Sequence, residues 1–185
     1  MIDIANDKPL RRFLWWSAIV FYVATMYLTL DIAPSVWRRI NAAFSGKGAI
    51  PQYIFYSTIG CCAIYYMVLV KKEKRVFRYV FFALCVLAFL LMVKMERTSG
   101  EKVHMAQYGL LAFLLYKALR IDIPRRDPRL YLYGCTGCVT IGTVDELIQL
   151  FLPHRFFTAH DIFVNALSGV LVFLFIRFNV IEPGA

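Results

Sequence analysis

Residues 77–93 read FRYVFFALCVLAFLLMV, an apolar run that contains a single charged residue, Arg78. Five further apolar runs occupy residues 13–30, 52–70, 104–119, 131–152 and 161–178. Most of them approach the roughly 20 residues that a helix needs to cross about 30 Å of hydrocarbon. The pattern predicts an all-α fold, a polytopic membrane bundle of about six transmembrane helices.

The composition of the whole chain agrees with this prediction. Of the 185 residues, 60% are hydrophobic and 18% are charged, and the mean hydropathy is +0.60. Soluble proteins contain about 25% charged residues, so this chain has too few polar residues to cover a soluble domain of its size. We therefore expect an integral membrane protein, and the composition excludes an intrinsically disordered chain.

The basic residues are distributed unevenly between the apolar runs. The N-terminus, the second and fourth connections and the C-terminal tail together contain 14 Lys and Arg, whereas the other three connections contain 7. Because cytoplasmic loops carry the excess of basic residues in membrane proteins, both termini are predicted to be cytoplasmic. The net charge of +9 then reflects topology, and we expect no nucleic-acid partner. Residues 35–45 alternate apolar and basic residues at helical spacing, which predicts an interfacial helix or, alternatively, an ordinary loop.

The five cysteines all lie inside apolar stretches, so no disulfide framework is expected. Cys135 and Cys138 form a CxxC pair without the following His of a haem site or the second CxxC of a zinc site. We interpret the pair as two small core residues. We expect no cofactor and no bound metal.

Polar residues gather in the second half of the chain. Asp145, Glu146 and Gln149 lie in the fifth run, where an unpaired acid at the membrane centre costs about 2.5–3.5 kcal/mol. They should therefore face protein or a water-filled cavity. Thr158 and Asp161 have the spacing of a capping box at the start of the sixth run.

The start of the fourth run has a similar pattern. Thr98 and Glu101 again have capping-box spacing, and Glu101, His104 and Tyr108 lie along one helical face. On the predicted topology, this group and the polar residues of the fifth and sixth runs all lie at the outer leaflet. Together they form one candidate site.

The order of these residues resembles the pattern of the VanZ-like membrane proteins, a family named for an accessory teicoplanin-resistance protein. The residues that carry the resemblance, which covers about residues 101–172, are Lys102, His104, Tyr108, Glu146, Gln149, Pro153, Arg155, Thr158, Asp161 and Asn165. The chain departs from the pattern at Ser168, where the family usually has a glycine, and Gly169 follows one position later.

The resemblance implies a division of the single membrane domain into two parts. Residues 96–185 would be the VanZ-like C-terminal helices with the polar site, and residues 1–95 would be N-terminal spans outside the resemblance. It also implies a place in the cytoplasmic membrane of a bacterium and a role in the cell envelope. Some members reduce the action of lipoglycopeptide antibiotics at the cell surface, but the resemblance implies no defined reaction.

Three functions are compatible with the sequence. The first is binding or modification of an anionic lipid, a lipid-linked envelope precursor or a lipophilic antibiotic in the outer-leaflet pocket. Its candidate ligand-binding residues are Lys102, His104, Tyr108, Glu146, Gln149, Arg155, Asp161 and Asn165. The second is a membrane enzyme that acts on a lipid phosphate, with Glu146, His104 or Asp161 as catalytic candidates. The third is an accessory subunit that docks with partner membrane subunits.

Each candidate residue also has a structural interpretation. Glu146 and Arg155 would form a buried ion pair, Asp161 would cap a helix, and Asn165 would make an interhelical hydrogen bond. A zinc site formed by Glu146 with the three histidines is disfavoured because the sequence has no HExxH spacing. Membrane lipids are the partners that every interpretation shares.

Overall fold

A computed structural model of the chain describes residues 7–32, 74–95, 99–152 and 158–180, together with isolated positions between 35 and 68. Within the first four of these ranges the chain forms five α-helices and no strand. They are α1 (Lys8–Thr29), α4 (Val76–Met95), α5 (Ser99–Leu119), α6 (Pro128–Gln149) and α7 (Ala159–Phe175), and α7 continues into a π-helical segment, Ile176–Val180. The all-α prediction is confirmed.

Three of the helices begin at a polar residue that caps the first turn. The Asp7 carboxylate accepts a hydrogen bond from the Leu10 backbone N–H at 3.0 Å, and Asp127 accepts one from Arg129 N–H at 2.9 Å. A proline occupies the first turn of α1 and of α6, where its missing N–H removes no helical hydrogen bond. The predicted cap at Thr158 is also present at the start of α7.

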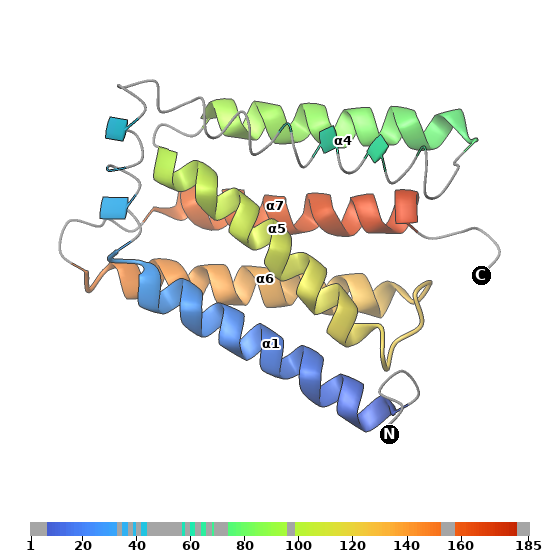
Figure 1. Ribbon diagram of the computed structural model, residues 1–185, viewed down its shortest axis with the longest axis horizontal. Helices are drawn as coiled ribbons and strands as arrows, with labels where there is room; N and C mark the ends of the chain where they lie inside the picture. Colours follow the sequence, from blue (N-terminus) through green and yellow to red (C-terminus); the bar gives the residue numbers. More distant parts are fainter. Residues whose placement is uncertain are drawn as a thin grey trace.

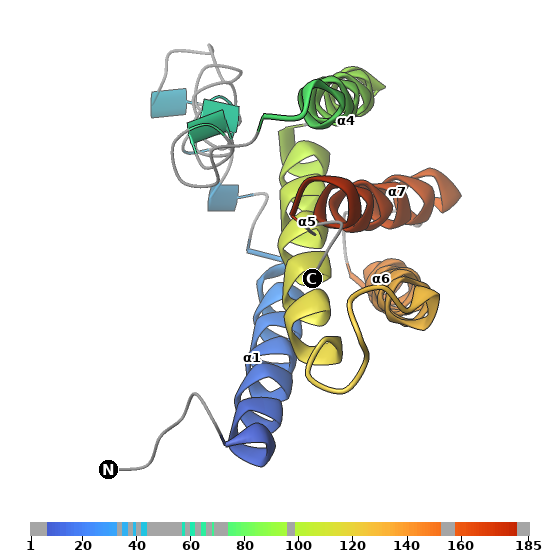
Figure 2. The same ribbon diagram turned by 90° about the vertical axis from the view of Figure 1, so that its right-hand side faces the viewer.

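The helices pack around α5 and α7, as two views at right angles show (Figures 1 and 2). α7 contacts α4, α5 and α6, and α5 also contacts α1. The main core lies where α1, α5, α6 and α7 meet. Its largest fully buried side chains are Tyr108, Tyr116 and Phe173.

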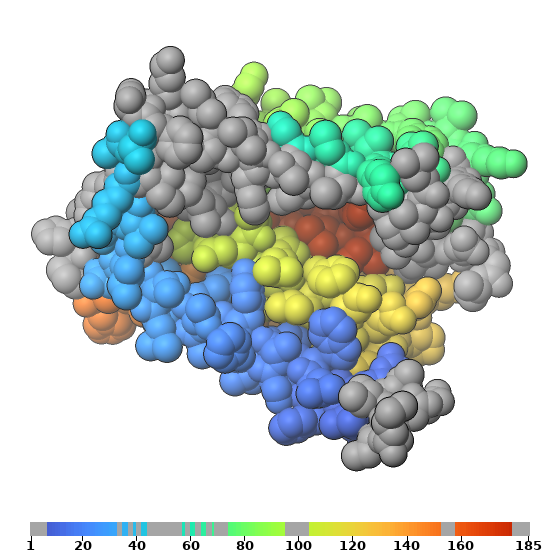
Figure 3. Space-filling model, in the orientation of Figure 1, coloured from blue at the N-terminus to red at the C-terminus, as the bar shows by residue number. Residues whose placement is uncertain are grey.

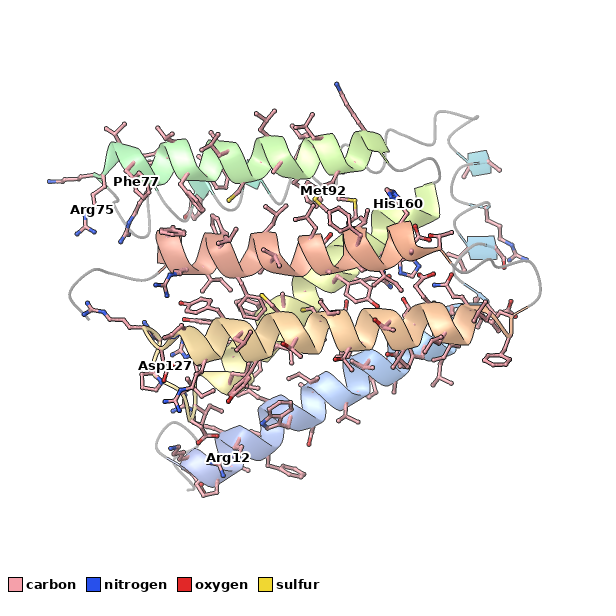
Figure 4. All side chains as sticks on the ribbon, turned by 180° about the vertical axis from the view of Figure 1, so that it is seen from behind. Arg12, Arg75, Phe77, Met92, Asp127 and His160 are labelled. Carbon is pink, nitrogen blue, oxygen red and sulfur yellow. The ribbon has the colours of Figure 1, made fainter. Side chains whose placement is uncertain are left out.

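Successive helices from α4 to α7 run in alternating directions (Figure 1). Arg12, Arg75 and Asp127 lie at one end of the molecule, and His160 lies at the opposite end (Figure 4). We call these the basic end and the polar end. The polar end carries the end of α6 and the start of α7.

An ion pair ties the start of α1 to the connection between α5 and α6. The Asp122 carboxylate accepts a hydrogen bond from Arg12, and its Oδ1 lies 3.2 Å from Lys8 Nζ. The Arg12 hydrogen bond, aided by Lys8, holds the pKa of Asp122 below its ordinary value of 3.8. The ion pair of Asp122 therefore stabilises the folded chain at pH values above 3.8. This stabilisation is lost as the pH falls through the lowered pKa of Asp122.

Two helical stretches, Val76–Lys94 and Ala159–Phe178, are long and apolar enough to cross a membrane. The predicted count of six spans is not confirmed, since no other described helix is long and apolar enough to cross a membrane. α6 falls short because its buried face carries Asp145, Glu146 and Gln149 among several glycines. The predicted run 52–70 and the predicted interfacial helix at 35–45 lie largely outside the described residues.

Candidate functional site

Asp145 of α6 is the most deeply enclosed acid among the described residues, with no exposed surface. Its Oδ2 accepts a hydrogen bond from the Tyr108 hydroxyl at 3.1 Å and lies 3.6 Å from His104 Nδ1. His104 and Tyr108 are one turn apart on α5, so the same helix face directs both side chains at α6. Tyr108 is fully buried, and the His104 side chain keeps 14% of its surface exposed.

Glu146, the next residue along α6, joins the end of that helix to the start of α7. Its Oε1 accepts a hydrogen bond from Gln149 Nε2 at 3.0 Å, and its Oε2 accepts one from the Thr158 backbone N–H at 3.4 Å. The Thr158 hydroxyl in turn accepts a hydrogen bond from the Asp161 backbone N–H at 3.1 Å. Glu146 is therefore fixed against the cap of α7, and Asp161 lies in the first turn that this cap begins.

Gly142 is the point where the three helices of the site meet. A Cβ at this position would lie 3.3 Å from the Tyr108 ring and 3.5 Å from Asn165 Cβ. The missing side chain lets α5 and α7 approach α6 closely one turn away from Asp145. Asn165 is buried in this contact.

α7 approaches α6 closely at Gly169, the residue after Ser168. Gly169 faces Cys138 of α6, and a Cβ there would lie 2.9 Å from the cysteine sulfur. Ser168 is buried and donates a hydrogen bond to the Val164 carbonyl at 2.8 Å. Gly169 thus provides the close approach, while the Ser168 hydroxyl is satisfied within its own helix.

Two tyrosines of α1 hold that helix against the same region. The Tyr22 hydroxyl donates to the Gln107 carbonyl at 3.0 Å, and the Tyr27 hydroxyl donates to the Ile141 carbonyl at 2.9 Å. Both acceptors are in the helices that carry the site. α1 therefore closes one side of the site, a role for these tyrosines that sequence reasoning missed.

We define the polar cluster as the buried or half-buried polar side chains at this junction of three helices. Its members are His104, Tyr108, Asp145, Glu146, Gln149 and Asn165. Five of the six are candidates from the sequence. Asp145 was predicted to be buried but was not among the ligand-binding candidates. The sequence does indicate that Asp145 belongs to the site, because Gly142, Asp145 and Gln149 recur on one helical face.

Some predicted site residues cannot be placed in the cluster. Pro153, His154 and Arg155 lie outside the described residues, as does the side chain of Lys102. His160 is described and is exposed on the first turn of α7. Across the described ranges, no three His, Cys, Asp or Glu residues are grouped as metal ligands would be.

The cluster can perform two kinds of chemistry. Its two carboxylates accept hydrogen bonds, so they can hold hydroxyl or amino groups of a ligand or orient cationic side chains. The imidazole of His104 beside Asp145 can accept or donate a proton. No family model, curated protein or solved structure matches the chain. Its function must therefore be inferred from the cluster itself.

Proposed function

We propose that the chain is a VanZ-like integral membrane protein whose polar cluster binds the headgroup of an amphiphilic ligand at the outer leaflet. The ligand would be an anionic lipid, a lipid-linked envelope precursor or a lipophilic antibiotic. The observation that carries the proposal is the complete burial of two consecutive acids, Asp145 and Glu146, near one end of an apolar bundle. Acids at membrane depth are costly and are usually retained for binding or transport.

The membrane location is supported by the surface of α1 and α4. Phe21 and Leu28 of α1 are 76% and 78% exposed, and α4 exposes Val76, Leu84 and Leu87. Soluble monomers rarely expose apolar areas of this extent. A lipid bilayer would cover these side chains without a further protein.

An anionic headgroup requires positive charge beside the two acids, and the proposal assigns this role to Arg155 and Lys102. Arg155 lies between Gln149 and Thr158 in the sequence, and both of these residues contact Glu146. A guanidinium held by one carboxylate keeps further donors that can bind a phosphate or a second carboxylate in a bidentate way.

Substitution of Arg155 tests this proposal. Arg155→Lys keeps the charge but loses the planar fork, so the lipid that co-purifies in mild detergent should fall while thermal stability changes little. Glu146→Gln should instead destabilise the fold, because breaking a buried charge pair costs about 3–5 kcal/mol. Arg126→Lys, at the basic end, is the matched control and should affect neither.

Native mass spectrometry measures the bound lipid, and thermal unfolding measures stability. The binding proposal fails if Arg155→Lys retains its lipid and loses as much stability as Glu146→Gln. Arg155 would then be a structural tie between α6 and α7.

A membrane enzyme is the second candidate, favoured by the separation of 3.6 Å between His104 Nδ1 and Asp145 Oδ2. A carboxylate in this position orients the imidazole and stabilises its protonated form, so that the other ring nitrogen can serve as general base. Such an enzyme would hydrolyse or transfer a lipid phosphate. His104→Gln would then abolish turnover while lipid binding persists. An accessory subunit, the third possibility, would instead co-purify with stable partner subunits.

A further inference from the structure

A second group of charged and aromatic side chains lies at the basic end, remote from the polar cluster. Lys117, in the last turn of α5, lies between two aromatic rings, with Nζ 5.9 Å from the centre of Trp15 and 5.3 Å from that of Phe113. One turn further, the Arg120 guanidinium lies 5.9 Å from the centre of the Tyr116 ring. Aromatic faces attract cations at such distances.

Three cations follow one another at this end of the chain. Arg120 comes one turn after Lys117, and Arg125 lies in the connection between α5 and α6. The negative end of the α5 helix dipole favours a cation in the last turn, but it amounts to only about half an elementary charge. A group of several cations therefore needs a further anion.

The acids of this end are already occupied by other cations. Asp122 pairs with Arg12 and Lys8, and Asp127 binds Arg129 through Nη2 at 2.6 Å. Among the described residues, no carboxylate forms an ion pair with the three cations Lys117, Arg120 and Arg125. An anion that binds all three cations would come from outside this part of the chain.

The surface beside these cations is apolar. Leu110 and Phe113 are 47% and 40% exposed, and they precede Lys117 by about two turns and one turn on the same face of α5. Figure 3 shows α1 and α5 side by side on the surface of the molecule. An anion with apolar chains fits this surface better than a soluble anion does.

We propose that Lys117, Arg120 and Arg125, with Trp15 and Phe113, bind the phosphate headgroup of an anionic phospholipid of the inner leaflet. An acyl chain of this lipid lies along Leu110 and Phe113. We call these five residues the basic lipid site. The inference rests on the proposed membrane insertion and on the predicted cytoplasmic orientation of the basic end, and it is independent of any ligand at the polar cluster.

Fluorescence of Trp15 provides a local probe. Trp16→Phe and Trp37→Phe together leave Trp15 as the only tryptophan of the full-length chain. This chain is placed in phosphatidylcholine nanodiscs that contain a small fraction of either brominated phosphatidylglycerol or brominated phosphatidylcholine. Because bromine quenches on contact, the phosphatidylglycerol should quench Trp15 more strongly at equal mole fraction.

Charge removal then identifies the binding side chains. Lys117→Gln and Arg120→Gln should each lower the relative affinity for phosphatidylglycerol about fivefold, the effect expected for one basic residue at a membrane surface. Arg129→Gln removes the same charge from the same end, but its guanidinium is engaged by Asp127, so quenching should be preserved. His160→Gln changes an exposed residue at the polar end and should also leave quenching unchanged.

Four outcomes would overturn the basic lipid site. They are equal quenching by both brominated lipids, an equal loss in Arg129→Gln, loss of the preference in His160→Gln, or displacement of the lipid by inorganic phosphate beyond the effect of chloride at equal ionic strength. Each of them leaves membrane insertion and the polar cluster intact. Release of the chain from membranes by alkaline carbonate would instead contradict the proposed membrane insertion, and the basic lipid site with it.

Discussion

At the scale of single residues, two buried tyrosines of α5 differ in what their hydroxyl groups contact. The Tyr108 hydroxyl donates to Asp145, whereas the Tyr116 hydroxyl, also buried, has no hydrogen-bond partner among the described residues. A buried hydroxyl without a partner costs free energy, and a buried carboxylate that loses a donor costs more. The same substitution should therefore have opposite consequences at the two positions.

Tyr108→Phe should lower the free energy of unfolding by about 1–3 kcal/mol, because Asp145 loses a donor that water cannot replace. Tyr116→Phe should leave stability unchanged or raise it slightly, since no hydrogen bond is lost. Thermal or denaturant unfolding of both variants in the same detergent measures the difference. Equal losses would mean that Tyr108 stabilises the fold by packing alone and that the polar cluster does not depend on its hydroxyl.

Among the helical elements, α6 and α7 make a tight contact toward the basic end. Gly134 of α6 faces the ring of Phe173, and a Cβ at this position would overlap the ring. The ring is buried between helices and cannot move aside without disturbing its neighbours. This contact, together with Gly169 against Cys138, holds α7 at the distance from α6 that the polar cluster requires.

Gly134→Ala should destabilise the protein by about 1–3 kcal/mol, the usual cost of adding a methyl group to a filled core. Gly109→Ala is the matched control, because a Cβ there would only touch Val172 at 3.5 Å and alanine favours a helix. Thermal unfolding of the two variants tests the packing. If both substitutions are tolerated equally, α6 and α7 are farther apart than described here.

In the whole molecule, the uneven distribution of charged residues along the sequence corresponds to two ends that carry different charged residues. Arg12, Arg75 and Asp127 lie at the basic end, and His160 lies at the polar end (Figure 4). The positive-inside rule predicts that the basic end lies in the cytoplasm and that the polar cluster lies near the outer leaflet. Both proposals depend on this orientation, since each assigns its ligand to one leaflet.

Cysteine labelling can determine the orientation. Arg126→Cys and His160→Cys introduce exposed thiols at opposite ends of the molecule. In intact cells, a membrane-impermeant maleimide should label the chain with His160→Cys and should label the chain with Arg126→Cys only after the membrane is opened. The unmodified chain corrects for the natural cysteines. Labelling in the reverse order would place the polar cluster at the inner leaflet.

The sequence was enough to predict the helical class, the approximate bounds of the five described helices and the Thr158 cap. These features depend on residues within a few positions of one another, so periodicity and capping residues are enough to predict them. The burial of Asp145 and Glu146 was likewise predictable, because an acid within a long apolar run must face protein or water.

Which side chains meet could not be predicted from the sequence, because it depends on how the helices pack. Asp145 pairs with Tyr108 across 37 positions of sequence, and Asp122 pairs with Arg12 across 110. The same packing places Lys117 between the rings of Trp15 and Phe113. Helical periodicity defines the face on which a residue lies, but the crossing of α1, α5, α6 and α7 determines which faces come into contact. That crossing depends on close approaches such as the one at Gly142, which arise from the packing of all four helices together.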